Sequence, residues 1–164
     1  MELVYGRVVT HMPPAGKHGE RARRLGAWIG RVADEMSVAC VTVETGYLLR
    51  SDPDLVRGPD VALVFRERLP GRDVPEEGYV PVPPDLAVEV VSPNDLPSKV
   101  LEKVGQYLDA EVPRIWVVDA GTRSVAVYSP GRTQRVFVEG DSLGPDELGI
   151  EGADFSLAVS DIFR

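Results

Sequence analysis

The fold is decided by residues 85–119, whose sequence is DLAVEVVSPNDLPSKVLEKVGQYLDAEVPRIWVVD. The apolar run at 85–91, with the single charge of Glu89 inside it, predicts a buried strand. A Ser-Pro-Asn turn ends this strand, and a helix with apolar residues three and four positions apart is expected to run to about Asp109. Residues 114–119 predict a second strand. The stretch therefore predicts a strand, a helix and a strand in succession.

The residues before this stretch extend the alternation of helices and strands. Residues 18–36 predict an amphipathic helix, because their apolar side chains repeat at three- and four-residue steps. Runs rich in β-branched and apolar residues predict a strand at 38–50, with an irregularity near Gly46, and a strand at 60–65. The residues after 119 predict a β-rich C-terminal tail. The order helix, strand, strand, strand, helix, strand (αβββαβ) predicts an α/β (α+β) fold in which helices flank a mixed central sheet.

The composition is that of one globular domain covering residues 1–164, with 43% hydrophobic and 27% charged residues. No apolar run approaches the roughly 18 residues that a membrane span needs. The single Cys40 cannot form an internal disulfide, which favours a reducing, cytoplasmic location. Two histidines exclude a three-histidine metal site. The net charge of −8 argues against an open surface that binds polyanions along its whole length.

Two acidic residues stand where a charge is costly. Asp60 opens the apolar run at 60–65 directly after Pro59, and Glu89 lies inside the run at 85–91. A buried carboxylate destabilises a fold unless it is paired, hydrogen-bonded or bound to a metal. If the two strands are neighbours, both carboxylates converge on one oxygen-rich site suited to Mg²⁺ or Mn²⁺. The alternatives are a turn role for Asp60 and a structural salt bridge between Glu89 and an arginine.

A lysine on the following helix completes this constellation. At about 100° per residue, Lys103 falls at the edge of the apolar face, while Lys99 lies about 40° further toward solvent. The face itself consists of Leu96, Val100, Leu101, Val104, Tyr107 and Leu108. From that edge Lys103 can reach Glu89, where an ammonium orients an attacking water and stabilises charge on a phosphate. The alternative is a lysine that only extends its ammonium into water at the helix margin.

These residues resemble a known nuclease pattern. Pro59-Asp60 followed by Glu89-Val90-Val91, within the αβββαβ order, is similar to the PD-(D/E)XK nuclease superfamily. Residues 85–119 are very similar to the most recognisable stretch of its Uma family of restriction-endonuclease-like proteins. GPDVALVF at 58–65 and the early His18 also match. The resemblance covers nearly the whole chain and implies a restriction-endonuclease-like fold.

The resemblance implies hydrolysis of phosphodiester bonds in DNA that depends on Mg²⁺ or Mn²⁺. Asp60 and Glu89 would bind the metal through their side chains and Val90 through its backbone carbonyl. Lys103 would position or polarise the attacking water. The chain departs from the superfamily pattern at Val91, where a lysine is usual. In the Uma family a lysine on the following helix takes that role, and Lys103 is at the matching position.

Several residues and a second function stay open at this point. His18 is either a partly buried structural histidine or a contact of the site, Glu44 either lines the site or does not, and Lys99 is expected in water. The substrate is DNA or RNA, and the same fold without catalysis would serve as a nucleic-acid-binding or scaffold module. The C-terminal strands leave a sheet edge that a second copy of the chain can cover, so a homodimer is expected.

Overall fold

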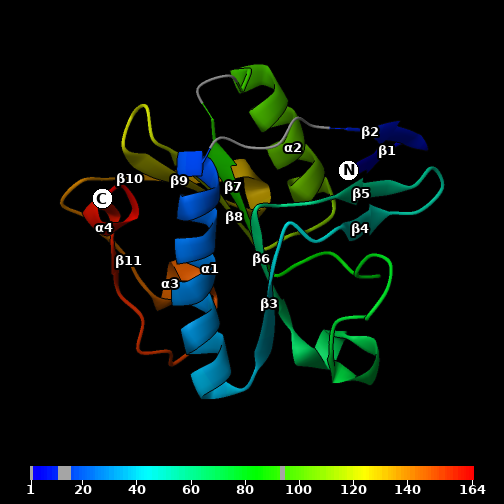
Figure 1. The fold of residues 1–164 in the computed structure, drawn as a ribbon, viewed down its shortest axis with the longest axis horizontal. Helices are drawn as coiled ribbons and strands as arrows, with labels where there is room; N and C mark the ends of the chain where they lie inside the picture. The colour runs from blue at the N-terminus through cyan, green and yellow to red at the C-terminus, as the bar shows by residue number, and fades with distance from the viewer. Residues whose placement is uncertain (1, 11–15, 93–94) are drawn as a thin grey trace.

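A computed structural model describes residues 2–10, 16–92 and 95–164 of the chain. A six-stranded mixed sheet forms the centre of the fold (Figure 1). Its strands are β3 (Ala39–Val43), β6 (Val61–Phe65), β7 (Leu86–Val91), β8 (Arg114–Asp119), β9 (Ser124–Ser129) and β10 (Thr133–Val138). They lie in the order β10-β9-β8-β7-β6-β3, with β7 and β8 parallel and the other neighbouring pairs antiparallel. Pro93 and Asn94 of the expected turn lie outside the described residues.

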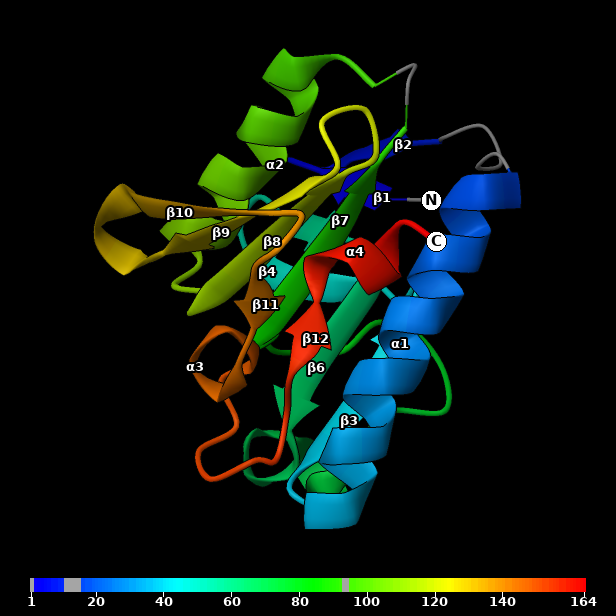
Figure 2. The same cartoon turned by 90° about the vertical axis from the view of Figure 1, so that its left-hand side faces the viewer.

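Two helices, α1 (Gly16–Met36) and α2 (Pro97–Asp109), cover opposite faces of this sheet (Figure 2). α1 begins two residues before the start that the sequence predicts. It buries one stripe of side chains, which consists of His18, Ala22, Leu25, Ile29, Val32 and Ala33. α2 buries Val104 and Tyr107 in a separate apolar cluster that contains Ala87 of β7. The sheet therefore has two distinct apolar layers, one under each helix.

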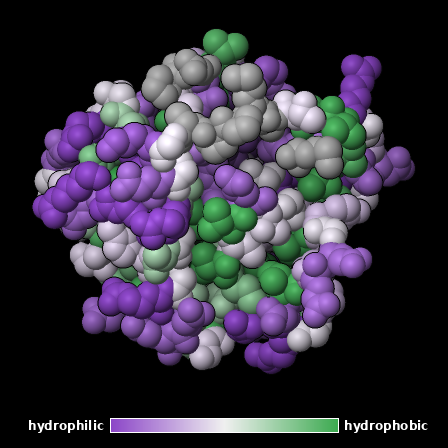
Figure 3. Space-filling model, in the orientation of Figure 1, coloured by the Kyte–Doolittle hydropathy of each residue, from purple (hydrophilic) through white to green (hydrophobic). Residues whose placement is uncertain are grey.

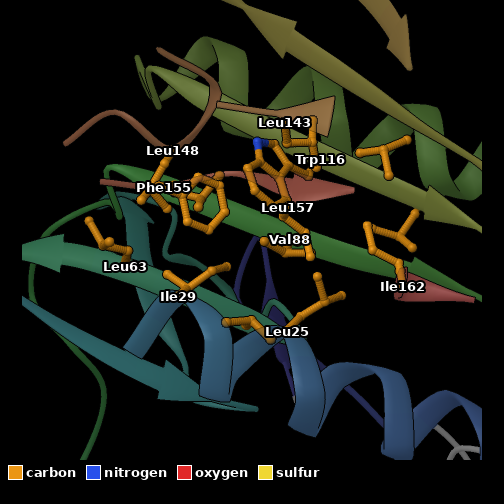
Figure 4. Packing of buried hydrophobic residues seen from close by; sticks show 14 of the residues in the cluster. Leu25, Ile29, Leu63, Val88, Trp116, Leu143, Leu148, Phe155, Leu157 and Ile162 are labelled. Atoms are coloured by element: carbon orange, nitrogen blue, oxygen red, sulfur yellow. The ribbon is translucent and has the colours of Figure 1, made fainter. Parts of the chain in front are cut away.

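The layer under α1 is filled by large apolar side chains (Figure 4). Leu25 and Ile29 of α1 belong to this layer together with Val88 of β7. Its far side is closed by β11 (Ser142–Leu143), α3 (Pro145–Leu148), β12 (Leu157–Ala158) and α4 (Val159–Ile162). Each such side chain removed from water contributes about 1.5–3 kcal/mol to folding. Because side chains alternate along a strand, Val88 on this face places Glu89 on the opposite face, toward α2.

A second, smaller sheet lies beside α2 and carries the start of the chain (Figure 1). Its antiparallel strands, in the order β2-β1-β5-β4, are β1 (Glu2–Val4), β2 (Arg7–Val9), β4 (Tyr47–Arg50) and β5 (Leu55–Arg57). The single strand predicted at 38–50 is therefore two strands, β3 and β4, which belong to different sheets, and the break between them lies at the irregularity predicted near Gly46. The chain changes direction at Glu44, where φ is 51°, and at Gly46, where a Cβ would lie 3.1 Å from Val56.

The predicted αβββαβ order is confirmed, because α1, β3, β6, β7, α2 and β8 follow one another around the central sheet and a β-rich tail comes after them. Three short 3-10 turns occupy Arg66–Arg68, Pro70–Arg72 and Pro130–Arg132. Figure 3 shows hydrophilic residues over most of the face seen in Figure 1, with hydrophobic residues gathered near its centre. Among the described residues, no helix has the length and apolar character that crossing a membrane requires.

Candidate functional site

The antiparallel pairing of β6 with β7 brings the two predicted carboxylates together. The strands are neighbours, as predicted, and Val61 pairs with Val88. One position beyond this pair, Asp60 lies directly before β6 and Glu89 lies on β7. Residues that face each other on such a pair have Cβ atoms about 5 Å apart. Both carboxylates therefore stand at the same end of the same strand pair.

Asp60 is fixed by contacts that reach beyond its own turn. Its Oδ2 accepts a hydrogen bond of 2.6 Å from the backbone N–H of Val90 on β7. The same oxygen lies 3.2 Å from Nε2 of His18 on α1. A turn residue would bond its local backbone, whereas Asp60 joins the first helix to the strand that carries Glu89. The carboxylate is therefore held at the point where α1, β6 and β7 meet.

His18 belongs to this site on the evidence of its contact with Asp60. The side chain is buried, and its Nδ1 has no hydrogen-bond partner within the described part of the chain. The hydrogen bond to Asp60 raises the pKa of His18, against the lowering effect of burial. The signal in the sequence was the position of His18 on the buried stripe of α1, which placed it in the core without showing its partner.

Glu89 is buried and both of its oxygens are engaged. Oε2 accepts a hydrogen bond of 2.9 Å from Nζ of Lys103, and Oε1 accepts one of 2.7 Å from the hydroxyl of Tyr107. Burial raises the pKa of Glu89, as does the charge of Asp60, while Lys103 opposes both effects. The charged partner of Glu89 is thus a lysine from α2 and not the arginine that the alternative interpretation expected.

Lys103 keeps its charge because carboxylates surround it. Burial alone would lower the pKa of Lys103, but the charges of Glu89, Glu2 and Asp60 outweigh burial and raise it. Oε1 of Glu2, on β1, lies 3.4 Å from Nζ. The neighbour of Lys103 one turn along the helix is Tyr107, whose burial raises its pKa well above the usual value. An ammonium and a neutral phenol therefore face Glu89 from α2.

A second set of polar residues supports the lysine, and no pattern in the sequence pointed to it. Arg57 on β5 donates from Nη1 to Oε2 of Glu2 at 2.7 Å and from Nε to Oε1 of Gln106 at 2.7 Å. The backbone N–H of Gly58 donates to Oε1 of Glu2 at 3.2 Å. Glu2, Arg57 and Gln106 are all buried. Each comes from a different element, so only the folded chain brings them together.

A cavity of about 420 Å³ opens beside Glu89 and Lys103 and is suited in size to a small ligand. Glu89, Val90 and Lys103 are among the residues that line it. The apolar part of its lining consists of Val4, Val9, Val91, Leu96 and Val100, and the remaining polar part of Arg57, Asp95, Lys99 and Glu102. The cavity therefore joins an ammonium and a carboxylate to an apolar wall between the first hairpin and α2.

Two other residues considered from the sequence, Lys99 and Glu44, have exposed side chains. Lys99 is exposed, as predicted, and pairs with Glu102 at 2.8 Å. The side chain of Glu44 is exposed, and the contact of this residue with the site is a backbone N–H that donates to the carbonyl of Asp60 at 3.3 Å. Leu96 and Leu101, expected on the buried face of α2, are both more than half exposed, so that face is narrower than predicted.

The donor atoms of the two carboxylates suit a hard divalent cation. Across residues 2–10, 16–92 and 95–164, no three His, Cys, Asp or Glu side chains form a group that could enclose a metal ion. Mg²⁺ keeps several waters and is usually held by one or two carboxylates, so Asp60 and Glu89 fit this mode of binding. The hydrogen bond to Asp60 also places the backbone of Val90 beside that carboxylate. The metal and its three ligands stay a prediction.

Comparisons with known proteins bear on what this site does. A model of the Uma2 family, described as "Putative restriction endonuclease", matches residues 1–160. Among solved structures, a crystal structure described as a putative nuclease belonging to DUF820 from Anabaena variabilis ATCC 29413 is similar, with a TM-score of 0.79. That alignment covers 99% of this chain and 88% of the other at 24% identity, so it shows a shared fold. The comparison with curated proteins found no match.

Proposed function

Because this chain belongs to the Uma2 family, described as putative restriction endonucleases, we propose that it is a metal-dependent nuclease that hydrolyses phosphodiester bonds in DNA. One observation carries the proposal. Asp60, Glu89 and Lys103 come from separate parts of the sequence and meet at one end of the β6–β7 pair, beside a cavity. Two carboxylates and an ammonium in one place are the groups that metal-assisted phosphodiester hydrolysis uses.

Asp60 and Glu89 would hold Mg²⁺ or Mn²⁺ through their side chains, with the backbone carbonyl of Val90 as a further ligand. A cation bound there supplies Lewis acidity toward the phosphate. The chain prepares both carboxylates for this role. Asp60 is fixed by the N–H of Val90, and Glu89 is oriented by the hydroxyl of Tyr107. Fixed ligands do not have to reorganise when the substrate arrives.

Lys103 would act on the attacking water and on the phosphate. Its ammonium lies at the wall of the cavity, and the neighbouring carboxylates keep it protonated. From there it can orient a water by a hydrogen bond and offset the negative charge that develops on the phosphate oxygens. Removal of one such preorganised group typically lowers kcat by about 10²–10³.

A catalytically silent module with this fold is the second candidate function. The observation in its favour is that the two carboxylates already have partners on the chain, since Asp60 binds Val90 and His18 while Glu89 binds Lys103 and Tyr107. The net charge of −8 favours the scaffold form of this module, because phosphate contacts, which need positive charge, dominate binding to nucleic acid. A binding or scaffold module needs no divalent cation at this site.

A homodimer would serve the proposed activity, since two sites can cut two strands. β10 is one of the two outer strands of the central sheet, β3 being the other, and the outer edge of β10 has no strand partner among the described residues. Val136 and Val138 on this strand are both more than half exposed. An exposed edge strand with apolar side chains can pair with another chain. We propose that a second copy of this chain covers it.

The test is cleavage of supercoiled plasmid DNA with Mg²⁺ or Mn²⁺, with EDTA as the control for metal dependence. We expect the wild type to nick the plasmid and Lys103→Ala to lose at least about a hundredfold in rate. Arg132→Ala is the matched control, because it removes an exposed cation that pairs with exposed Asp109 at the end of α2, and neither residue lines the cavity.

Metal-dependent nicking that Lys103→Ala loses and Arg132→Ala keeps would support the nuclease. The absence of cleavage by folded wild type, over a range of salt concentrations and on both DNA and RNA, would favour the silent module. Equal cleavage by wild type and Lys103→Ala would remove Lys103 from the mechanism.

A further inference from the structure

We propose that Glu2 is a positioning residue that holds the ammonium of Lys103, an inference that rests on the proposed nuclease function and deepens it. Glu2 lies on β1, is 4% exposed, and has its Oε1 3.4 Å from Nζ of Lys103. The same nitrogen lies 2.9 Å from Oε2 of Glu89. The ammonium is therefore placed between two buried carboxylates that belong to different sheets.

Glu2 is itself fixed on both oxygens. Arg57 donates to Oε2 at 2.7 Å, and the N–H of Gly58 donates to Oε1 at 3.2 Å. Arg57 also binds Gln106, which lies three residues after Lys103 on α2. These contacts tie β1 and β5 to the helix that carries the lysine. Because buried hydrogen-bonded charges have few alternative positions, the Oε1 that faces Lys103 is held in place.

The two carboxylates beside Lys103, those of Glu89 and Glu2, have different roles in the proposed reaction. Glu89 is a proposed ligand of the cation, so the negative charge it offers to Lys103 falls when a cation is bound. Glu2 is held by Arg57 and Gly58 and is not itself a proposed ligand, so its attraction for the ammonium stays when a cation is bound. Glu2 therefore keeps Lys103 at the cavity wall when Glu89 is engaged elsewhere.

Glu2 also connects the lysine to the turn that leads into Asp60. The N–H that binds its Oε1 belongs to Gly58, two residues before Asp60. One carboxylate therefore contacts both the ammonium of Lys103 and the backbone before the first proposed ligand. Residues that support a reactive group in this way typically change activity by about 10- to 100-fold when they are altered.

The test observes Lys103 directly. The chain has three lysines, Lys17, Lys99 and Lys103, so protein labelled with ¹⁵N at the lysine amines gives few signals, and Lys103→Arg assigns one of them. In metal-free wild type the Lys103 signal should show slow exchange with water, because its ammonium is partly buried and hydrogen-bonded. We expect exchange about tenfold faster in Glu2→Gln.

A matched variant separates positioning of Lys103 from support of the fold. Arg57→Gln removes the other half of the Glu2–Arg57 pair but leaves the N–H of Gly58 on the oxygen that faces Lys103. We expect the Lys103 signal to change less in Arg57→Gln than in Glu2→Gln, even where thermal unfolding shows an equal loss of stability. Glu2→Asp, which keeps the charge on a shorter side chain, should lie between wild type and Glu2→Gln.

Kinetics supply the second readout. In plasmid cleavage, Glu2→Gln should lower kcat by about 10- to 100-fold with KM unchanged, and Glu2→Asp should recover part of this loss. An unchanged Lys103 signal in folded Glu2→Gln, or an equal change in Arg57→Gln, would overturn the proposal. If the wild type cleaves nothing, the nuclease proposal fails, while the amine signals still decide whether Glu2 holds Lys103.

Discussion

Nζ of Lys103 on α2 lies 2.9 Å from Oε2 of Glu89 on β7, so a helix supplies the cation that the superfamily pattern places on the strand. The strand position in question is Val91, two residues after Glu89. Because side chains alternate along a strand, Val91 points to the same face of the sheet as Glu89. It lines the same cavity as Lys103. A lysine at the strand position and a lysine on the helix thus place an ammonium in the same cavity.

A cation at this site should stabilise the folded protein. With Mg²⁺ at about a hundred times its Kd, binding adds about 2.7 kcal/mol, which raises Tm of a chain of this size by about 5–10 °C. Glu89→Gln removes one proposed ligand and should abolish most of this rise, measured by thermal unfolding with Mg²⁺ and with EDTA. Glu139→Gln, which breaks an exposed ion pair with Arg123, should keep it. A full rise in Glu89→Gln would exclude Glu89 as a ligand.

The contact between His18 and Asp60 predicts a pH dependence of stability in EDTA. The pKa of His18 is raised by its hydrogen bond to Asp60, so the folded protein binds a proton more tightly than the unfolded chain. This stabilisation is complete below the ordinary pKa of about 6.5 and is lost as pH rises through the raised value. His18→Gln should therefore cost more free energy of unfolding in acid than in base.

The expected extra loss of unfolding free energy in acid follows from the strength of the hydrogen bond between His18 and the carboxylate of Asp60. A hydrogen bond to a charged group contributes about 2 kcal/mol, so urea unfolding should show His18→Gln less stable than wild type by about that amount near pH 5.5. Near pH 9 most of the extra cost should have disappeared, because His18 is then neutral in both states. If the loss of unfolding free energy caused by His18→Gln grows with pH, then His18 is not protonated in its contact with Asp60.

Local sequence patterns were enough to predict that Asp60, Glu89 and Lys103 lie close together. Glu89 stood out as one charge in an apolar strand, and helical spacing placed Lys103 where it could reach back to that charge. Both inferences use only the period of a single element, which is encoded over a few residues. The facing positions of Asp60 and Glu89 follow in the same way, once two apolar strands are taken as neighbours.

The contacts of Glu2 with Arg57 and Lys103 could not be predicted from such local patterns. Glu2 and Arg57 lie on strands of three residues each and meet across 55 positions of the chain. Strands so short carry no readable alternation, and no local pattern records a pairing over that distance. At 38–50 the sequence pattern indicated an irregularity near Gly46 but not that the chain crosses there from one sheet to the other. The crossing follows from the pairing of β3 with β6 and of β4 with β5, which the residues of 38–50 alone do not encode.

The cavity beside Lys103 should bind the substrate, so a negative charge on its apolar wall should repel the phosphate. Val100 lines the cavity, whereas the next residue, Leu101, is 57% exposed and does not. Val100→Glu should raise KM about tenfold, equivalent to 1.4 kcal/mol, with little change in kcat. Leu101→Glu adds the same charge to the same helix and should leave KM unchanged. Equal KM values for the two variants would mean that the substrate avoids this cavity.

The proposed homodimer places a second chain along the outer edge of β10. Val136→Lys puts a charge on the apolar part of that strand, and edge lysines oppose pairing between sheets. We expect sedimentation to give twice the mass of one chain for wild type and the mass of one chain for Val136→Lys.

Val8→Lys is the control for this dimer, because Val8 is also exposed and lies on β2, one of the two outer strands of the smaller sheet. It should sediment as wild type does, since only the outer edge of β10 is proposed to pair. If Val8→Lys dissociates the dimer and Val136→Lys does not, the two copies meet through the smaller sheet. The interface would then lie next to Glu2 on β1, and the second copy would bear on the position of Lys103.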